Sequence, residues 1–340
     1  MLKIQDIADK VGVSRTTVSN VIHGKTKKVS QETIKKISDI LTEEGYVPNK
    51  MPMIFSEKAS KIIGIVLGFD IAHGRHALKD FFIGEFLAGT QISAQKAGYY
   101  IMIIDGSEIE KIADIASRWN IDGLIILGFN QDKYNSLKRI LNKNMVLVDA
   151  YPSKNCDYNF VNVGIDDFSG GEQIGKHLLE NGFSKALFMA ETKVDSDYYR
   201  WLGFKKAMES KGDFCSKSRY VIIPSDEKQR YKFYEQNLSL FLKASALAFS
   251  SDITAIEAIN YFQDNGISVP NQISITGFDD CFYASLLRPR LTTVHQDINE
   301  KARLSIEILI KMINNMPIDK VDNKSPVYLV CRQSVKINKI

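Results

Sequence analysis

The sequence predicts a small all-α helix-turn-helix headpiece followed by an α/β core of two doubly wound subdomains, each with a parallel sheet. Three observations support this fold class. Apolar residues recur at helical spacing in three short segments of residues 1–46. Further along, short apolar runs alternate with amphipathic segments, which is typical of βαβ units. The 340 residues are also too many for one ordinary domain.

The change of apolar period divides the chain into three regions. We expect a helix-turn-helix domain at residues 1–46, a hinge or linker at 47–61 and the α/β core at 62–340. The linker contains Pro48 and Pro52, which punctuate regular structure.

Each helix of the headpiece has a start or stop signal. The first is predicted to end at Gly12, because the spacing i, i+3, i+4, i+7 of apolar residues stops there. Ser14 can cap a second helix that runs to Gly24, and Ser30 can cap a third that ends before Gly45. The short turn between the first two helices makes a helix-turn-helix unit.

The core contains two series of strands with helices between them. The strand candidates of the first series are 62–68, 99–104, 122–128 and 145–149, and those of the second are 160–163, 185–190, 219–223, 246–250 and 273–279. The helix candidates lie near 80–97, 108–118, 132–142, 168–181, 199–211, 228–243 and 253–265. Strands that alternate with helices in this way favour parallel, doubly wound sheets.

The second helix of the headpiece has one polar and one apolar side. At about 100° per residue, the polar arc holds Arg15, Thr16, Ser19, Asn20 and His23. Arg can read guanine, Asn can read adenine, and Thr can contact either a polar base edge or a thymine methyl. Hydroxyls of Ser14, Thr17 and Ser19 near the helix start suit phosphate oxygens. A single amphipathic helix more often has only a solvated polar face, but the three-helix setting favours DNA reading.

The headpiece carries a series of ordered motifs. These are D-[IV]-A at 6–8, G-V-S-x-x-T-V-S at 12–19, V-S-x-x-T at 29–33 and G-Y-x-P-N at 45–49. This pattern resembles the DNA-binding headpiece of the lactose and galactose repressor (LacI/GalR) family. Weaker family motifs continue through the chain, among them R-x-x-G-F at 200–204, G-F-D-D at 277–280 and L-T-T-V at 291–294.

The resemblance implies roles for the headpiece and the linker. Arg15 and Thr16 match the positions that choose the operator half-site, and Asn20 stands where many members have Arg. His23 matches a variable position that often contacts DNA, although a helix-end histidine that binds nothing is about as common. In the family, a hinge helix at the position of residues 50–56 pairs with that of a dimer mate.

The linker residues agree with such a hinge helix. Asn49 can cap it, and Phe55 stands where the family inserts a Leu into the minor groove. Two turns are too short to persist alone in water, so we expect this helix to form only on double-stranded operator DNA. A tethered linker that packs on the core is the alternative.

The core resembles periplasmic sugar-binding proteins, in which two subdomains close on a ligand. The resemblance divides it into residues 62–161 with 293–322 and residues 162–292 with 323–340. Arg200 and Asp279 match the main polar ligand-binding residues, and Phe81 or Phe82 matches the aromatic wall. The further candidates by position are Asp70, Asp149, Ser251 and Ile298. We expect a small-molecule effector, most naturally a carbohydrate, and a homodimer.

The charge, the cysteine spacing and the apolar runs exclude several other functions. The net charge of +4 excludes a polybasic coat, and the four distant Cys residues give no zinc or disulfide pattern. There is no apolar signal segment and no apolar run near the roughly 18 residues that span a bilayer, which indicates a cytoplasmic protein without a membrane partner.

The sequence also contains no dinucleotide, P-loop, nucleophile-elbow or H-E-x-x-H motif, so we expect neither a cofactor nor an enzyme. The most consistent function is a ligand-responsive transcription regulator that acts as a repressor. The alternative is a ligand-binding protein, or an enzyme of unknown reaction, fused to a DNA-binding domain.

Overall fold

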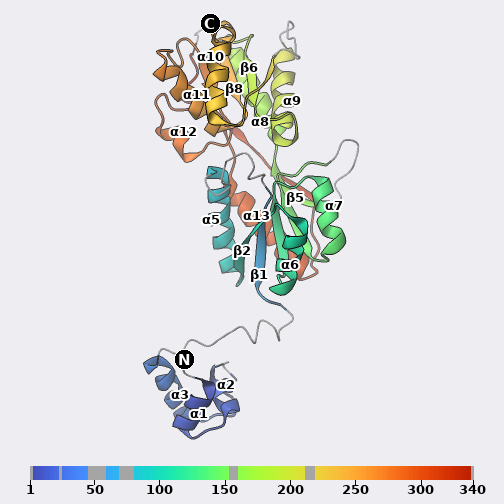
Figure 1. Cartoon of the computed structure of the whole chain (residues 1–340), viewed down its shortest axis with the longest axis vertical. Helices are drawn as coiled ribbons and strands as arrows, with labels where there is room; N and C mark the ends of the chain where they lie inside the picture. Colours follow the sequence, from blue (N-terminus) through green and yellow to red (C-terminus); the bar gives the residue numbers. More distant parts are fainter. Residues whose placement is uncertain are drawn as a thin grey trace. The chain divides into compact units, whose positions relative to one another are not determined.

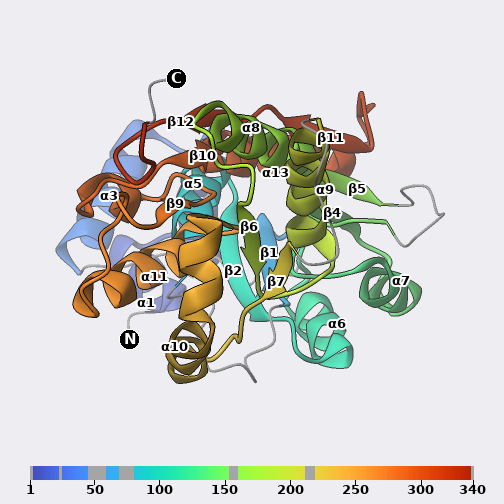
Figure 2. The same ribbon diagram turned by 90° about the horizontal axis from the view of Figure 1, so that it is seen from above.

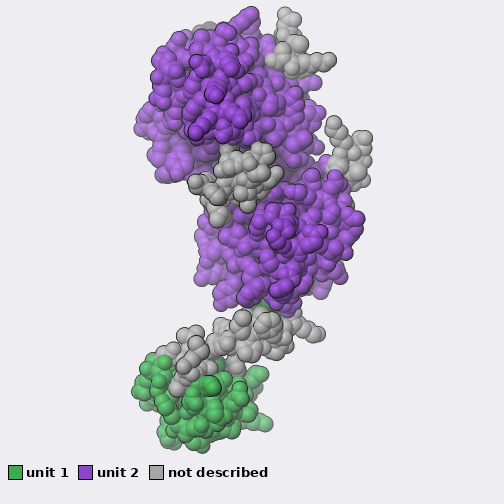
Figure 3. Space-filling model, in the orientation of Figure 1, with its two compact units in different colours: residues 1–60 green, residues 61–340 purple. Residues whose placement is uncertain are grey.

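The structure, a computed structural model, describes residues 3–22, 25–44, 59–68, 80–152, 160–210 and 219–337. The chain forms two compact units, residues 1–60 and 61–340 (Figure 3). The site candidates His23, Asn49, Phe55 and Asp70 and the predicted hinge helix at 50–56 lie outside the described residues.

The headpiece contains the three helices that the sequence predicts. They are α1 (Ile4–Val11), α2 (Arg15–Ile22) and α3 (Gln31–Glu43). Gly12 ends α1 with a left-handed φ of 74°, which costs glycine little because it has no Cβ. The backbone N–H of Thr33 donates to the Ser30 hydroxyl at 3.2 Å and so caps α3. Fully buried Ile7, Ala8, Val18 and Ile37 form the centre of the headpiece core.

The first subdomain of the core is built on a six-stranded parallel sheet with the order β11-β5-β4-β3-β1-β2. Its strands are β1 (Ile62–Leu67), β2 (Tyr100–Asp105), β3 (Gly123–Leu127), β4 (Asn144–Val148), β5 (Val161–Ile165) and β11 (Asp322–Ser325). Helices α5 (Phe81–Lys96) and α13 (Ile298–Ile313) pack on one face, and α6 (Ile109–Arg118) and α7 (Gln131–Ile140) on the other (Figure 1).

The second subdomain has a four-stranded parallel sheet with the order β7-β6-β8-β9. Its strands are β6 (Leu187–Ala190), β7 (Tyr220–Ile222), β8 (Ala246–Phe249) and β9 (Ser274–Thr276). Helices α8 (Asp167–Glu180) and α9 (Asp195–Glu209) cover one face (Figure 2). The other face packs on α10 (Glu227–Ala244) and α11 (Asp252–Asp264), and the short α12 (Phe282–Leu286) follows β9.

The structure corrects the expected subdomain limits in two places. Strand β5 was expected to open the second series, but it pairs with β4 and β11 in the first sheet, so this sheet extends to Ile165. Strand β10 (Thr293–His295) was expected in the first subdomain. It pairs antiparallel with β12 (Tyr328–Val330), and the Asp279 N–H donates to the Val294 carbonyl. Buried parallel strands have similar apolar sequences, so the pattern alone does not assign them to a sheet.

Two glycines allow α8 and α9 to pack closely. A Cβ on Gly171 would lie 1.8 Å from the carbonyl oxygen of Arg200, and one on Gly203 would lie 1.8 Å from that of Phe168. This contact places the start of α8 next to the middle of α9, which positions Asp167 beside Arg200. Within the described ranges, no helix is long and apolar enough to cross a bilayer.

Candidate DNA-reading and ligand-binding sites

The polar arc of α2 lies on the surface of the headpiece. Arg15 and Thr16 are exposed and Ser19 and Asn20 are half-buried, whereas Val18 on the opposite side is fully buried. The N–H of Thr17 donates to the Ser14 hydroxyl at 3.1 Å, and the hydroxyls of these two residues lie 2.9 Å apart. Ser14 and Thr17 therefore fix the start of α2, and Arg15 and Thr16 are the side chains free to extend from it.

Polar residues from both subdomains meet where their parallel strands end. Asp149 follows β4 directly, Ser250 and Ser251 follow β8, and Asp279 lies three residues after β9. This is the edge at which open α/β sheets bind ligands. We use the name junction cluster for six residues gathered here: Asp149, Asp167, Arg200, Asp279, Gln296 and Lys301.

Arg200 is the central cation of the second subdomain. It is 8% exposed, and its Nε donates to Asp167 Oδ1 at 2.7 Å while its Nη1 donates to the Ser250 carbonyl at 2.6 Å. Asp279 Oδ1 lies 3.6 Å from the same Nη1, and the guanidinium carbon lies 3.7 Å from the centre of the Phe278 ring. Arg200 is therefore held in place by a carboxylate, a carbonyl and an aromatic face.

Lys301 is the central cation of the first subdomain. Its ammonium donates to both oxygens of Asp149, at 2.8 and 2.7 Å, and to Gln296 Oε1 at 2.7 Å. Gln296 in turn donates from Nε2 to Asp279 Oδ1 at 2.7 Å. One chain of hydrogen bonds therefore runs from Asp149 in the first subdomain to Asp279 in the second.

Burial and neighbouring charges shift the pKa values of the cluster. Burial raises the pKa of the Asp149 carboxyl, against the opposite effect of Lys301. Burial likewise raises the pKa of Asp279 to about 6, although Arg200 lowers it. For Arg200, burial acts to lower the pKa, but Asp167 and Asp279 outweigh it and the pKa is raised. Strongly perturbed groups of this kind are typical of functional sites.

The remaining ligand candidates lie in different surroundings. The Phe82 ring faces Lys301, with 4.9 Å from the ammonium to the ring centre, so it borders the cluster. Phe81 instead makes an edge contact with Tyr283 of α12 at 6.2 Å. Ser251 precedes α11, and its hydroxyl lies 3.1 Å from that of Thr254. Ile298 is 3% exposed and belongs to the apolar core of the first subdomain, which fits packing better than ligand contact.

Four residues at this site were not among the sequence candidates: Tyr151, Asp167, Gln296 and Lys301. Tyr151 donates a hydrogen bond to Asp167 and stacks on Tyr199 at 4.7 Å. The sequence holds a signal for two of these residues. Asp167 is the first residue of a helix, and Gln296 lies two residues beyond the L-T-T-V motif. Nothing in the pattern around Lys301 distinguishes it from an exposed lysine.

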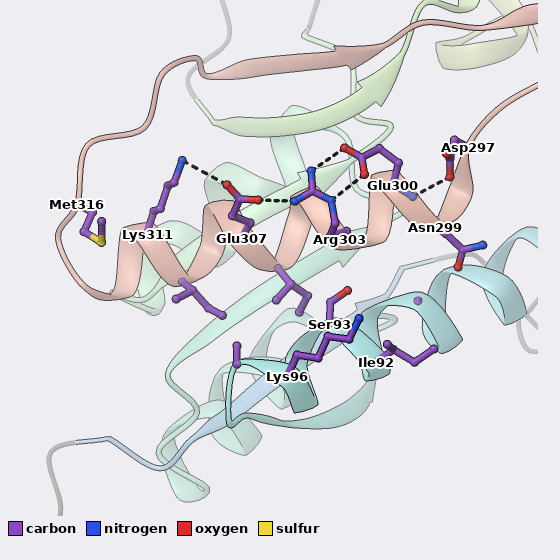
Figure 4. A pocket seen from close by; sticks show the side chains of 14 residues that line it. Ile92, Ser93, Lys96, Asp297, Asn299, Glu300, Arg303, Glu307, Lys311 and Met316 are labelled. Atoms are coloured by element: carbon purple, nitrogen blue, oxygen red, sulfur yellow. Dashed lines mark hydrogen bonds and ion pairs between the residues drawn. The ribbon is translucent and has the colours of Figure 1, made fainter.

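Two surface hollows lie near the start and along the side of α5. One, of about 700 Å³, is lined from both subdomains and includes Asp80, Phe81 and Tyr283. The other, of about 660 Å³, is an open groove between α5 and α13 (Figure 4). On its α13 side, Arg303 pairs with Glu300 and Glu307 (Figure 4). Because these charges satisfy each other, the groove offers weaker polar recognition than the junction cluster.

Two family models match the chain. The model of bacterial regulatory proteins of the lacI family matches residues 3–49, and that of the periplasmic binding protein-like domain matches residues 176–335. The first covers the helix-turn-helix and the second covers most of the second subdomain.

The chain thus carries a LacI-family helix-turn-helix domain joined to a periplasmic binding protein-like domain.

The curated relatives that match this chain over nearly its whole length are transcription regulators. The HTH-type transcriptional regulator RegA of Clostridium saccharobutylicum is 28% identical over 338 residues, covering 97% of this chain and 98% of its own. The HTH-type transcriptional repressor PurR of Haemophilus influenzae is 27% identical over 349 residues, covering 99% of each. The matched family and these relatives are regulators rather than enzymes.

Solved structures share the fold of this chain over nearly its whole length. A Lac repressor dimer bound to operator and the anti-inducer ONPF has a TM-score of 0.80 at 21% identity, covering 98% of both chains. The complex of the regulator CelR with cellobiose has a TM-score of 0.73 at 20% identity, covering 98% of this chain and 100% of that one. The LacI-family helix-turn-helix and the regulators matched over their whole length identify the protein as a LacI-type DNA-binding transcription regulator.

Proposed function

We propose that this LacI-family regulator is a homodimeric repressor that reads a pseudo-palindromic operator through Arg15 and Thr16 and is controlled by a small carbohydrate at the junction cluster. One observation carries the proposal. This chain combines an exposed polar arc on α2 with a cluster of Arg200, Asp149 and Asp279 near the ends of its parallel strands. The cellobiose in CelR and the operator-bound Lac repressor dimer support it by likeness.

The polar groups of the junction cluster suit a polyhydroxyl ligand. Carboxylates accept hydrogen bonds from hydroxyl groups, and a guanidinium donates them in a fixed plane. Phe82 supplies an aromatic surface beside them. Pockets that recognise small ligands combine apolar walls with a few fixed polar groups of this kind.

The second subdomain offers an apolar surface that supports dimer formation. Phe282, Tyr283 and Leu286 of α12 are 60%, 55% and 55% exposed. Large apolar side chains gathered on one short helix are typical of a surface that a partner covers. A symmetric dimer would present two headpieces to two operator half-sites, as a pseudo-palindrome requires.

The direct test is to select an operator from random duplexes with the purified full-length chain and then titrate sugars against the complex. We expect one selected sequence with two-fold symmetry, and a change in its affinity when the correct sugar is added. Arg200→Ala should keep operator binding and lose this response. Selection of unrelated sequences without symmetry, or an unchanged response in Arg200→Ala, would contradict the proposal.

A further inference from the structure

Lys301 is a charged residue in an unusually closed environment. Its side chain is 0% exposed, although it begins only a few residues into α13. A buried ammonium is costly unless its hydrogen bonds are made. All three of its N–H groups have an acceptor, namely both oxygens of Asp149 and Oε1 of Gln296. Lys301 therefore has no donor left for a ligand.

The ammonium determines how its two partners are oriented. A lysine can only donate, so the oxygen of the Gln296 amide must face it and the amide nitrogen must face away. That nitrogen donates to Asp279 Oδ1, which also lies near Arg200. Lys301 thus orients Asp149 directly and Asp279 through Gln296. The aromatic ring of Phe82 closes the remaining side of the ammonium.

The resulting site has more acceptors than donors. Three carboxylates, those of Asp149, Asp167 and Asp279, face the two cations Arg200 and Lys301. Asp149 and Asp279 keep 26% and 18% of their side chains exposed, whereas Lys301 is closed off. An incoming hydroxyl finds free carboxylate lone pairs. A phosphate would meet three carboxylates, with the Lys301 ammonium already satisfied and the Arg200 guanidinium already paired with Asp167, so the net charge of the cluster disfavours such ligands.

We propose that Lys301 is a positioning residue that orders the carboxylates of the junction cluster, and that the site thereby selects an uncharged polyhydroxyl ligand and rejects its phosphorylated form. This inference rests on the proposed carbohydrate response and names the class of effector more narrowly. Lys301 would thus help the site to distinguish neutral from anionic sugars without contacting the ligand itself.

The first test uses matched sugar pairs on the full-length protein. D-glucose is compared with glucose 6-phosphate, and D-ribose with ribose 5-phosphate, by calorimetry at pH 7.5. We expect a neutral sugar to bind at least ten times more tightly than its phosphate. A phosphate that binds as tightly as its neutral partner, or more tightly, overturns the selection. Binding by none of the sugars contradicts the proposed carbohydrate response, and the role of Lys301 is then judged by the second test.

The second test needs no ligand and follows thermal stability between pH 5 and pH 8. In Lys301→Met, Asp149 loses its cation, so its raised pKa rises further and its charged form destabilises the fold. We expect the melting temperature to fall by about 10 °C at pH 8 and the deficit to shrink as Asp149 takes up a proton toward pH 5. Asp149→Asn/Lys301→Met should recover most of the loss, with little dependence on pH.

The comparison isolates the Asp149–Lys301 pair. Among the described residues, the other ionisable groups that face Asp149 are Arg200, Asp167 and Tyr151, with Asp279 beyond Gln296, and they are the same in every variant. Lys311→Met on the same helix is the matched control. It removes a partly exposed lysine that pairs with Glu307, and we expect little change. The melting temperature of Lys301→Met could instead fall by an amount that does not depend on pH and is not recovered in the double variant, or the double variant could fail to fold. Either result would show that Lys301 only fills space in the core, and would overturn its positioning role.

Discussion

At the scale of single residues, the buried charges of the junction cluster are stable only as a set. Arg200 satisfies Asp167, and Lys301 satisfies Asp149. Removing one partner of a buried pair leaves an uncompensated charge, which typically costs about 3–5 kcal/mol. The same arrangement leaves the carboxylate edges of Asp149 and Asp279 accessible, so these two residues take part in the junction and still have lone pairs to offer a ligand.

Arg15 should contribute to base recognition and not only to phosphate binding. It is exposed on α2, and an arginine that reads guanine contributes about 1–3 kcal/mol to discrimination. We expect Arg15→Ala to lose this amount on the selected operator and much less on a scrambled duplex, as measured by fluorescence anisotropy. Lys35→Ala, an exposed cation on α3, is the control and should weaken both duplexes equally or neither. Equal losses on both duplexes in Arg15→Ala would limit Arg15 to phosphate contacts.

Asp279 should make stability depend on pH between about 4 and 6. Burial raises its pKa to about 6, whereas an unfolded Asp has about 3.9. The proton therefore favours the folded state, and this contribution is present below pH 4 and lost as the pH rises through 6. The Asn side chain of Asp279→Asn cannot ionise, so this variant does not lose that contribution. Its free energy of unfolding minus that of the original chain should therefore increase from pH 4 to pH 7, by on the order of 2 kcal/mol.

Urea unfolding at several pH values measures this difference. The φ of Asp279 is 118°, and Asn is among the residues that tolerate positive φ best, so the substitution adds little strain. Asp114→Asn, at an exposed pair with Arg118, is the control and should give a difference that does not vary with pH. A constant difference for Asp279→Asn as well would mean that this carboxyl titrates normally.

At the scale of elements, the contact between α8 and α9 depends on glycine. Gly203→Ala would place a Cβ 1.8 Å from the Phe168 carbonyl oxygen, so the helices must separate. We expect a loss of about 3 kcal/mol or more, with a weaker effector response because Asp167 and Arg200 move apart. Gly84→Ala in α5 meets no atom within 4 Å and should instead stabilise by about 0.5–1 kcal/mol. Chemical unfolding of both variants compares them, and equal effects would refute the close-packing explanation.

Most elements could be predicted from the sequence, and two candidate site residues, Arg200 and Asp279, do lie together in the structure. The helix starts at Ser14 and Ser30 follow from local capping chemistry, and Arg200 and Asp279 follow from motifs. In contrast, β5 was placed in the wrong sheet, and α13 was not among the predicted helices. A buried strand has the same apolar composition in either sheet, so only pairing with β4 and β11 decides its place.

At the scale of the whole molecule, effector binding and operator binding should be linked reciprocally. If the effector changes operator affinity by some factor, the operator must change effector affinity by the same factor. Allosteric couplings of about 1–3 kcal/mol correspond to roughly 5- to 150-fold. We expect the two factors to agree when anisotropy with and without sugar is compared with calorimetry with and without operator. A factor of one in both directions would mean that the sugar is not the effector.

The sequence by itself determined the three-helix headpiece, the alternation of strands and helices in the core and the type of regulator, because these depend on local spacing, capping and ordered motifs. Only the tertiary structure decided which strands share a sheet and that Lys301 is buried against Asp149. Those two residues are far apart in the chain, and the pattern around Lys301 is that of an ordinary solvated helix. Their pairing arises because α13 returns to the first sheet beside the end of β4, and chain folding, not local chemistry, determines that meeting.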